Sequence, residues 1–180
     1  MKTVILFFLL LTAASNIKAQ ELDVRLDVGL SYHAVRYYEN ILESIPPYNT
    51  AEVGQYIGIA VNQALSEKHR MGSRIDAQYL DGNLLNSFRA LDYYYQAFDE
   101  ITYNGFIGAA RYDFRTPAYG YTAGVGLYYR PRDWQSFGAS IEIQYMDKLA
   151  RDKLHPDDPD YEWDSFIDIR AITFGINYYF

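Results

Sequence analysis

The chain has 180 residues, no cysteine and a formal net charge of −7 at pH 7. The acidic balance argues against nucleic acid as a partner, because phosphate backbones attract basic proteins. The lack of cysteine excludes disulfide bridges and thiol catalysis.

Residues 1–19 read as a secretory signal peptide. Lys2 is followed by an apolar run over residues 4–11 and then by residues 12–19, which end on the small residue Ala19. The run is far shorter than the roughly 20 residues that a spanning helix needs. We therefore predict export, cleavage after Ala19 and a single domain over residues 20–180.

Eight segments of that domain alternate between apolar residues and small or polar ones. This is the period of β-strands that turn one face toward lipid. At roughly 10 residues per membrane strand plus turns, the domain has room for eight strands and few more. We predict an all-β fold, an eight-stranded antiparallel up-and-down transmembrane β-barrel. The predicted strands are residues 22–33, 53–62, 71–80, 88–98, 105–114, 119–130, 136–147 and 166–180.

The even strand number predicts the topology. Both termini lie on the periplasmic side, with short turns there and longer loops outside. A periplasmic turn is expected at Pro131. Pro46 and Pro47 favour a loop, because proline cannot sit inside a hydrogen-bonded ladder. The extracellular segments are predicted at residues 34–52, 81–87, 115–118 and 148–165.

The last predicted strand has the clearest alternation. Its apolar face carries Ile172, Phe174, Ile176, Tyr178 and Phe180. The other face is small or polar, as a strand between lipid and a lumen requires. The segment resembles the C-terminal targeting signal of bacterial outer-membrane barrels, which the outer-membrane assembly machinery reads. The residues that would carry this assembly signal are Thr173, Gly175, Tyr178 and Phe180.

The chain also resembles a family of small eight-stranded outer-membrane barrels, typified by the transmembrane domain of outer membrane protein A and related to surface-antigen-like barrels. The match is carried by residues 121–127, the Pro131 turn, the strand with Glu142 and residues 178–180. The resemblance implies localisation to the outer membrane of a Gram-negative bacterium. The implied partners are outer-membrane lipid, lipopolysaccharide and the assembly machinery.

A set of charged residues is predicted to point into the barrel. An eight-stranded barrel is too narrow for a wide pore, so these charges should pair in a plug of ion pairs and hydrogen bonds. A narrow, gated conduit is the alternative interpretation. The family resemblance implies a basic and acidic cluster in which Arg111 and Glu142 are counterparts. The predicted lumen set is Arg25, Asp27, Arg74, Asp76, Asp92, Arg111, Asp113 and Glu142.

An enzyme is a further hypothesis, since some small outer-membrane barrels modify lipid A or cleave peptides. Ser31 and His33 share one face of the first strand, and Asp27 or Glu142 could complete a triad. The order departs from the lipid A deacylase pattern, in which the histidine precedes the serine. We predict no enzymatic activity, and the catalytic candidates to test are Ser31, His33 and Glu142.

An acidic stretch near the C-terminal end offers hard oxygen ligands for a cation. It has no EF-hand pattern, so a solvated surface loop is the default interpretation, and we predict neither a metal site nor a cofactor. The candidate ligands, if a cation does bind, are Asp157, Asp158, Asp160 and Glu162.

Three functions remain open. The first is a structural or adhesin-like surface protein that binds an extracellular ligand through its loops. The second is a narrow channel for ions or small solutes. The third is a lipid-modifying enzyme. The predicted localisation favours the first, because the long loops would face the outside of the cell.

Overall fold

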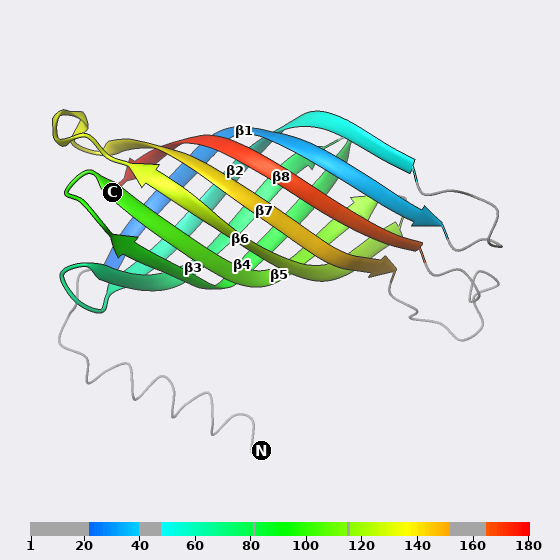
Figure 1. The fold of residues 1–180 in the computed structure, drawn as a ribbon, viewed down its shortest axis with the longest axis horizontal. Coiled ribbons are helices and arrows are strands. Elements are labelled where there is room, and N and C mark those ends of the chain that lie inside the picture. Colours follow the sequence, from blue (N-terminus) through cyan, green and yellow to red (C-terminus); the bar gives the residue numbers. More distant parts are fainter. Residues whose placement is uncertain (1–21, 40–47, 81, 115, 152–164) are drawn as a thin grey trace, which may run out of the picture.

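The structure, a computed structural model, describes residues 22–39, 48–80, 82–114, 116–151 and 165–180. These residues form eight antiparallel strands in a closed barrel, in which β1 pairs with both β2 and β8 (Figure 1). The strands are β1 Leu22–Glu39, β2 Tyr48–Ala64, β3 His69–Leu80, β4 Asn83–Gln96, β5 Ile101–Phe114, β6 Thr116–Tyr129, β7 Phe137–Arg151 and β8 Ser165–Tyr179. The predicted signal peptide lies outside the described residues.

All eight predicted strands are confirmed, but several are longer than predicted. Most of the loop predicted at residues 34–52 belongs to β1 and β2, and β4 already begins at Asn83. β7 likewise continues to Arg151. The exposed side chains of these added segments are mixed, with Arg36 and Asn49 polar and Ala34, Ala51 and Leu84 not, so the regular apolar alternation stops while the backbone ladder continues.

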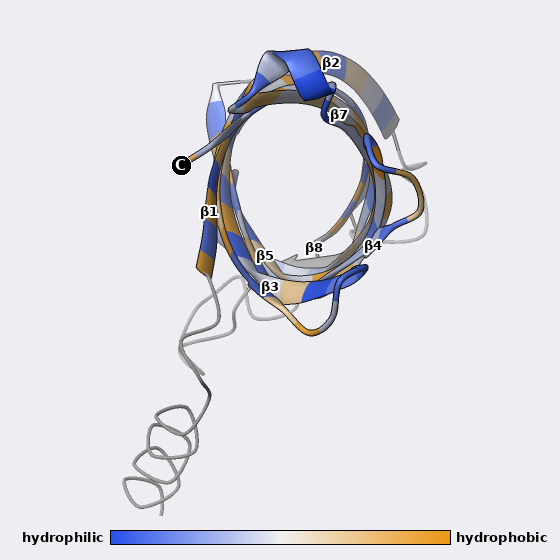
Figure 2. Cartoon of the chain, turned by 90° about the vertical axis from the view of Figure 1, so that its left-hand side faces the viewer, coloured by the Kyte–Doolittle hydropathy of each residue, from blue (hydrophilic) through white to orange (hydrophobic). Residues whose placement is uncertain are grey.

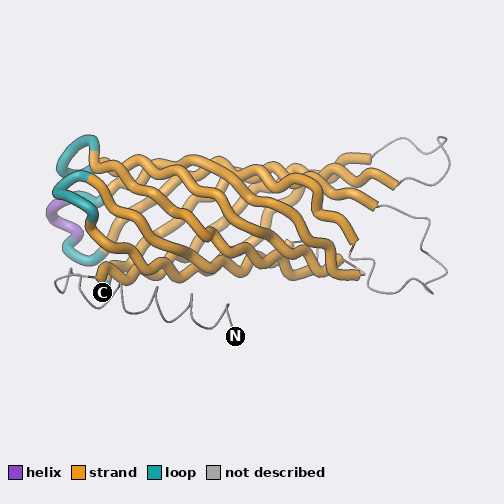
Figure 3. Tube along the Cα trace, turned by 90° about the horizontal axis from the view of Figure 1, so that it is seen from below, coloured by secondary structure: helices purple, strands orange, loops and turns teal. Residues whose placement is uncertain are grey.

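The connections between strands differ between the two ends of the barrel. Residues 65–68, 97–100 and 130–136 join strands at the end where the C-terminus lies (Figure 3). The predicted turn at Pro131 is confirmed, and it leads into a short 3-10 helix, η2, at Arg132–Trp134. At the other end Gly82 lies in the tight β3–β4 connection with φ of 73°, a conformation that glycine adopts without strain.

The outer wall is apolar around the barrel. Viewed along the axis, the ribbon alternates between hydrophobic and hydrophilic residues on every side (Figure 2). Exposed apolar side chains on this wall include Leu30, Ile57, Ile59, Ile75, Phe88, Ile107, Val125, Ile143, Phe174 and Ile176. Tyr93, Tyr95, Tyr103 and Tyr129 flank them toward the C-terminal end, and Tyr32, Tyr79, Tyr121 and Tyr145 toward the other. Such a belt between two aromatic girdles fits a membrane barrel.

The protein core is the lumen, which side chains fill. Glycines let bulky neighbours fit inside a narrow barrel: a Cβ at Gly58 would meet Asp76 and Arg74, and one at Gly175 would meet the Tyr56 hydroxyl. Among the described residues, no helix is long and apolar enough to cross a membrane.

Candidate functional site

The described lumen residues form layers along the barrel axis. β1 shows the order from the C-terminal end of the barrel: Arg25 and Asp27 come first, then Ser31 and His33, and finally Val35. β3, β4 and β7 repeat this order, so on these strands charged, polar uncharged and apolar side chains succeed one another. All five of these β1 side chains are buried.

Glu142 on β7 is the centre of the charged layer. Arg89 donates to both of its carboxylate oxygens, with Nη1 2.8 Å from Oε1 and Nη2 2.7 Å from Oε2. The Tyr128 hydroxyl donates to Oε1 at 2.5 Å, and Arg74 Nη1 lies 3.4 Å from the same oxygen. These groups are buried, so each contact is far stronger than it would be in water.

Two further carboxylates extend this layer. Arg74 Nε lies 2.5 Å from Asp76 Oδ1, and Arg74 Nη1 lies 2.8 Å from Asp27 Oδ2. Arg89 Nε forms a second ion pair with Asp76 Oδ2 at 3.0 Å. Arg74 and Arg89 therefore form ion pairs with three carboxylates from three strands, β1, β3 and β7. These ion pairs connect strands that are not neighbours in the barrel.

Arg25 forms the next contacts toward the C-terminal end. Its Nε pairs with Asp27 Oδ1 at 2.8 Å, and its Nη2 donates to the hydroxyls of Tyr94 and Tyr128 at 2.9 and 3.0 Å. The Tyr94 hydroxyl in turn donates to Asp92. Six of the eight predicted lumen residues are buried charged groups: Arg25, Asp27, Arg74, Asp76, Asp92 and Glu142.

For the other two residues, Arg111 and Asp113, the lumen prediction is wrong. The side chains of Arg111 and Asp113 are 46% and 30% exposed, and they pair with each other at 2.8 Å. Arg111 stands opposite Tyr119, which is exposed on the outer wall, whereas the neighbouring Tyr112 is fully buried. The parity of β5 therefore puts Arg111 and Asp113 outside, and Arg111 is not the counterpart of Glu142.

Arg89, the true counterpart, was missed because β4 has an irregularity. The register shifts between Arg89 and Leu91, so Arg89 and Asp92 both point inward although they are three residues apart. Strict alternation counted back from Asp92 puts Arg89 outside. The exposed apolar pair Phe88 and Leu91, also three residues apart, is the sequence signal that could have revealed the bulge.

The next layer contains two of the three catalytic candidates, Ser31 and His33, while the third, Glu142, lies in the charged layer. His33 Nε2 lies 2.9 Å from Gln78 Oε1, and Gln78 donates to Gln144 Oε1 at 3.2 Å. Ser31 is buried on the same face. The structure gives no hydrogen bond among the side chains of Ser31, His33 and Glu142, so these candidates are not joined as a triad.

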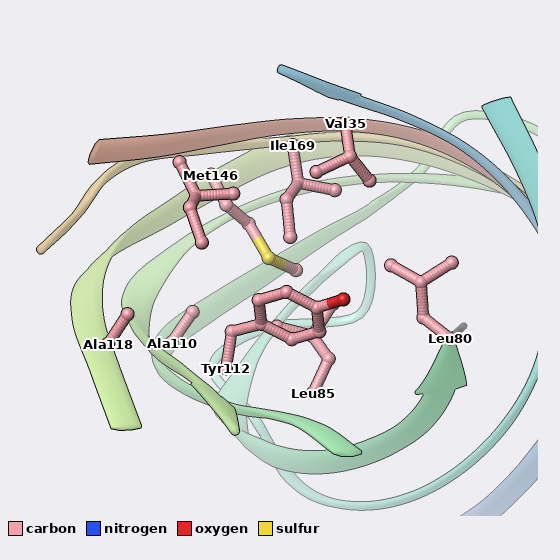
Figure 4. Packing of buried hydrophobic residues seen from close by; sticks show 9 residues of the cluster. Val35, Leu80, Leu85, Ala110, Tyr112, Ala118, Met146 and Ile169 are labelled. Atoms are coloured by element: carbon pink, nitrogen blue, oxygen red, sulfur yellow. The ribbon is translucent and has the colours of Figure 1, made fainter. Parts of the chain in front are cut away.

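The apolar layer fills the lumen toward the end away from the C-terminus. Figure 4 shows Met146, Ile169 and Val35 facing Tyr112, Leu80 and Leu85 across the barrel. Leu85, Tyr112, Met146 and Ile169 have no exposed surface. These buried apolar side chains offer a hydrated ion no polar partner, so the entry of an ion into this layer is costly.

A small cavity lies at the opposite end of the lumen. It has a volume of about 120 Å³, and its lining includes Arg25, Tyr94, Tyr128 and the ion pair of Asp23 with Arg70. No described residue of the apolar layer lines it. The cavity is therefore a vestibule that ends at the charged layer.

The predicted assembly residues divide between the faces of β8. Thr173 is buried, and its hydroxyl lies 3.5 Å from Glu142 Oε2, while Gly175 lies beside Tyr56. Outside, the rings of Tyr178 and Phe180 meet edge to face, with centroids 4.9 Å apart. The metal candidates at residues 157–162 lie outside the described residues, and the described ones contain no cluster of three or more metal-binding side chains.

No protein-family model and no curated protein sequence matches the chain. Solved structures do match its fold. Ail, the attachment invasion locus protein of Yersinia pestis, solved in complex with the heparin analogue sucrose octasulfate, has a TM-score of 0.53 at 13% identity, over 89% of this chain and 99% of that one. The outer membrane protein OprG of Pseudomonas aeruginosa has a TM-score of 0.52 at 12% identity, over 89% and 97%.

The similarity to these two structures covers the whole barrel. Nearly the full length of each neighbour aligns with this chain, and the outer wall of the barrel is apolar. The chain has the fold of the small eight-stranded outer-membrane β-barrels.

Proposed function

We propose that the chain is a non-conducting outer-membrane barrel that holds binding loops at the cell surface. The observation that carries this proposal is the double closure of the lumen, by the charged layer around Glu142 and by the apolar layer around Met146. A solute would have to break buried ion pairs and then cross a dry layer, and both steps are costly.

The proposed orientation puts the C-terminal end in the periplasm and the segments at residues 40–47 and 152–164 outside. Export by the predicted signal peptide and recognition of β8 by the assembly machinery belong to the same proposal. It is supported by the short connections at one end and by the extension of β1, β2 and β7 beyond the predicted membrane strands at the other.

The surface ligand follows from charge. Residues 152–164 contain six acidic side chains against a single lysine, so we propose a cationic partner, or an anionic one bridged by divalent ions. A polysulfated molecule such as the one bound by Ail would be repelled by this segment unless such ions are present.

Planar-bilayer recording of the purified chain tests the closed lumen. We expect no discrete conductance steps, and wild-type steps whose size changes in a folded Arg89→Ala variant would instead establish the channel hypothesis. Loop binding is tested separately by adherence of cells that display the full chain or a chain lacking residues 155–162. Equal adherence of the two strains, with both barrels folded, would refute the proposed binding role.

A further inference from the structure

A hollow of about 260 Å³ lies on the barrel wall at the end away from the C-terminus, where β1 runs between β2 and β8. In the ladders, Arg36 is paired with both Asn49 and Asp168, and Ala34 with Arg170. All of these residues line the hollow. Because Ala34 has only a methyl group, the wall is recessed between the two arginines.

The lining of the hollow has a net positive charge, although the protein as a whole has a net negative charge. Its charged lining residues are Arg36, Arg170 and Asp168, two cations against one anion, whereas the chain carries −7. Both arginines are exposed. The Arg170 guanidinium lies 5.8 Å from the centroid of the Tyr145 ring, which holds the group at the wall. Guanidinium groups donate paired hydrogen bonds that match phosphate oxygens.

The wall next to the hollow, toward the barrel middle, is apolar. Tyr32 precedes Ala34 on the same face of β1, and Ile172 follows Arg170 on the same face of β8. Leu30 and Phe174 continue this strip toward the middle of the barrel. A lipid with a phosphate head group could therefore place its phosphate against the arginines and its acyl chains against the apolar strip.

We propose that this hollow binds a phosphate of an outer-leaflet lipid, the lipid A part of lipopolysaccharide. Arg36 and Arg170 contact the phosphate, and the acyl chains lie along the strip from Tyr32 and Ile172 to Leu30 and Phe174. The assignment of the leaflet rests on the orientation given under the proposed function.

Arg111 provides a matched control on the far side of the barrel. It is also exposed near one end of the wall, and its guanidinium also lies 5.8 Å from a tyrosine centroid, that of Tyr119. It forms an ion pair with Asp113, one cation to one anion, whereas the lining of the hollow has two arginines and one aspartate. Loss of Arg111 removes one positive charge, as the loss of either hollow arginine does, without touching the hollow.

The test is native mass spectrometry of the full chain in detergent with added bisphosphorylated lipid A. We compare the wild-type protein, Arg36→Gln/Arg170→Gln and Arg111→Gln, each shown to be folded by its heat-dependent gel mobility. Loss of two charge-assisted contacts should lower the bound fraction about tenfold or more in the double variant. Arg111→Gln should bind as the wild type does, and dephosphorylated lipid A should bind weakly to all three.

Three outcomes would overturn the proposal. One is equal binding by the double variant and the wild type, and another is an equal loss in Arg111→Gln, which would indicate a non-specific charge effect. The third is loss of binding in the presence of EDTA, since direct arginine contacts need no divalent cation. The measurement is made in detergent and without a loop ligand. Its outcome is therefore independent of the conductance and adherence tests of the proposed function.

Discussion

Arg89 on β4 and Glu142 on β7 form a bidentate ion pair across the lumen, at 2.7 and 2.8 Å, although 53 residues separate them in the chain. Both side chains are almost fully buried. The pair links two strands that are not neighbours in the barrel. The ion pair therefore connects the two strands across the lumen, where no backbone hydrogen bonds join them.

Glu142→Gln should destabilise the barrel by about 3–5 kcal/mol, because it leaves the buried Arg74 and Arg89 short of negative charge. The measurement is urea unfolding of the barrel in lipid vesicles, followed by gel mobility. The control is Asp113→Asn, which breaks an exposed pair worth about 0–1 kcal/mol. Similar losses in both variants would mean that the central pair has no special role.

Gly58→Val should destabilise the barrel by about 1–3 kcal/mol, since the new side chain would overlap Asp76 and Arg74. Gly105→Val is the matched control, because nothing lies within 4 Å of a Cβ at Gly105. Its effect should stay within about 0.5 kcal/mol. The same unfolding assay applies, and a tolerated valine at position 58 would contradict the packed centre.

Met146→Ala should cost about 2–5 kcal/mol, because Met146 is fully buried in the apolar layer. It should not open a conductance, since the charged layer around Glu142 still closes the lumen. Unfolding and planar-bilayer recording on the same preparation check the two statements. Conductance steps in this variant would show that the apolar layer is the sole barrier.

Ile59→Arg should cost about 2–4 kcal/mol, the value for a charge on the lipid face near the bilayer midplane. Ile59 is 55% exposed on the outer wall in the middle part of β2. Ala51→Arg, on the same face nearer the end of β2, should cost only about 0–1 kcal/mol. Equal costs at the two positions in vesicles would contradict the proposed lipid belt.

His33→Ala should leave lipid A unmodified and cost about 1–3 kcal/mol, because Gln78 loses a buried hydrogen-bond partner. Gln78→Ala breaks the same contact and should give a similar loss. Mass spectra of lipid A from cells that express each variant provide the chemical readout. A mass shift produced by the wild type and abolished only in His33→Ala would support the enzyme hypothesis.

Much of the lumen was predictable because side chains alternate strictly along a strand. Arg25, Asp27, Arg74 and Asp76 lie in regular stretches, and their inward direction followed from the sequence. The predictions failed where that regularity ended or had no clear anchor. The bulge near Arg89 inverted the parity of β4, and the short apolar alternation around Arg111 left the parity of β5 ambiguous.

The sequence by itself determined the eight strands and, for most of them, the face that meets lipid, because both depend on a local period of two residues. The tertiary structure decided which charges meet. The partner of Glu142 depends on the bulge of β4 and on the closure of β1 against β8, which brings side chains from non-neighbouring strands to one point inside the barrel. Such cross-lumen distances arise only when the ladder closes, so no local pattern encodes them.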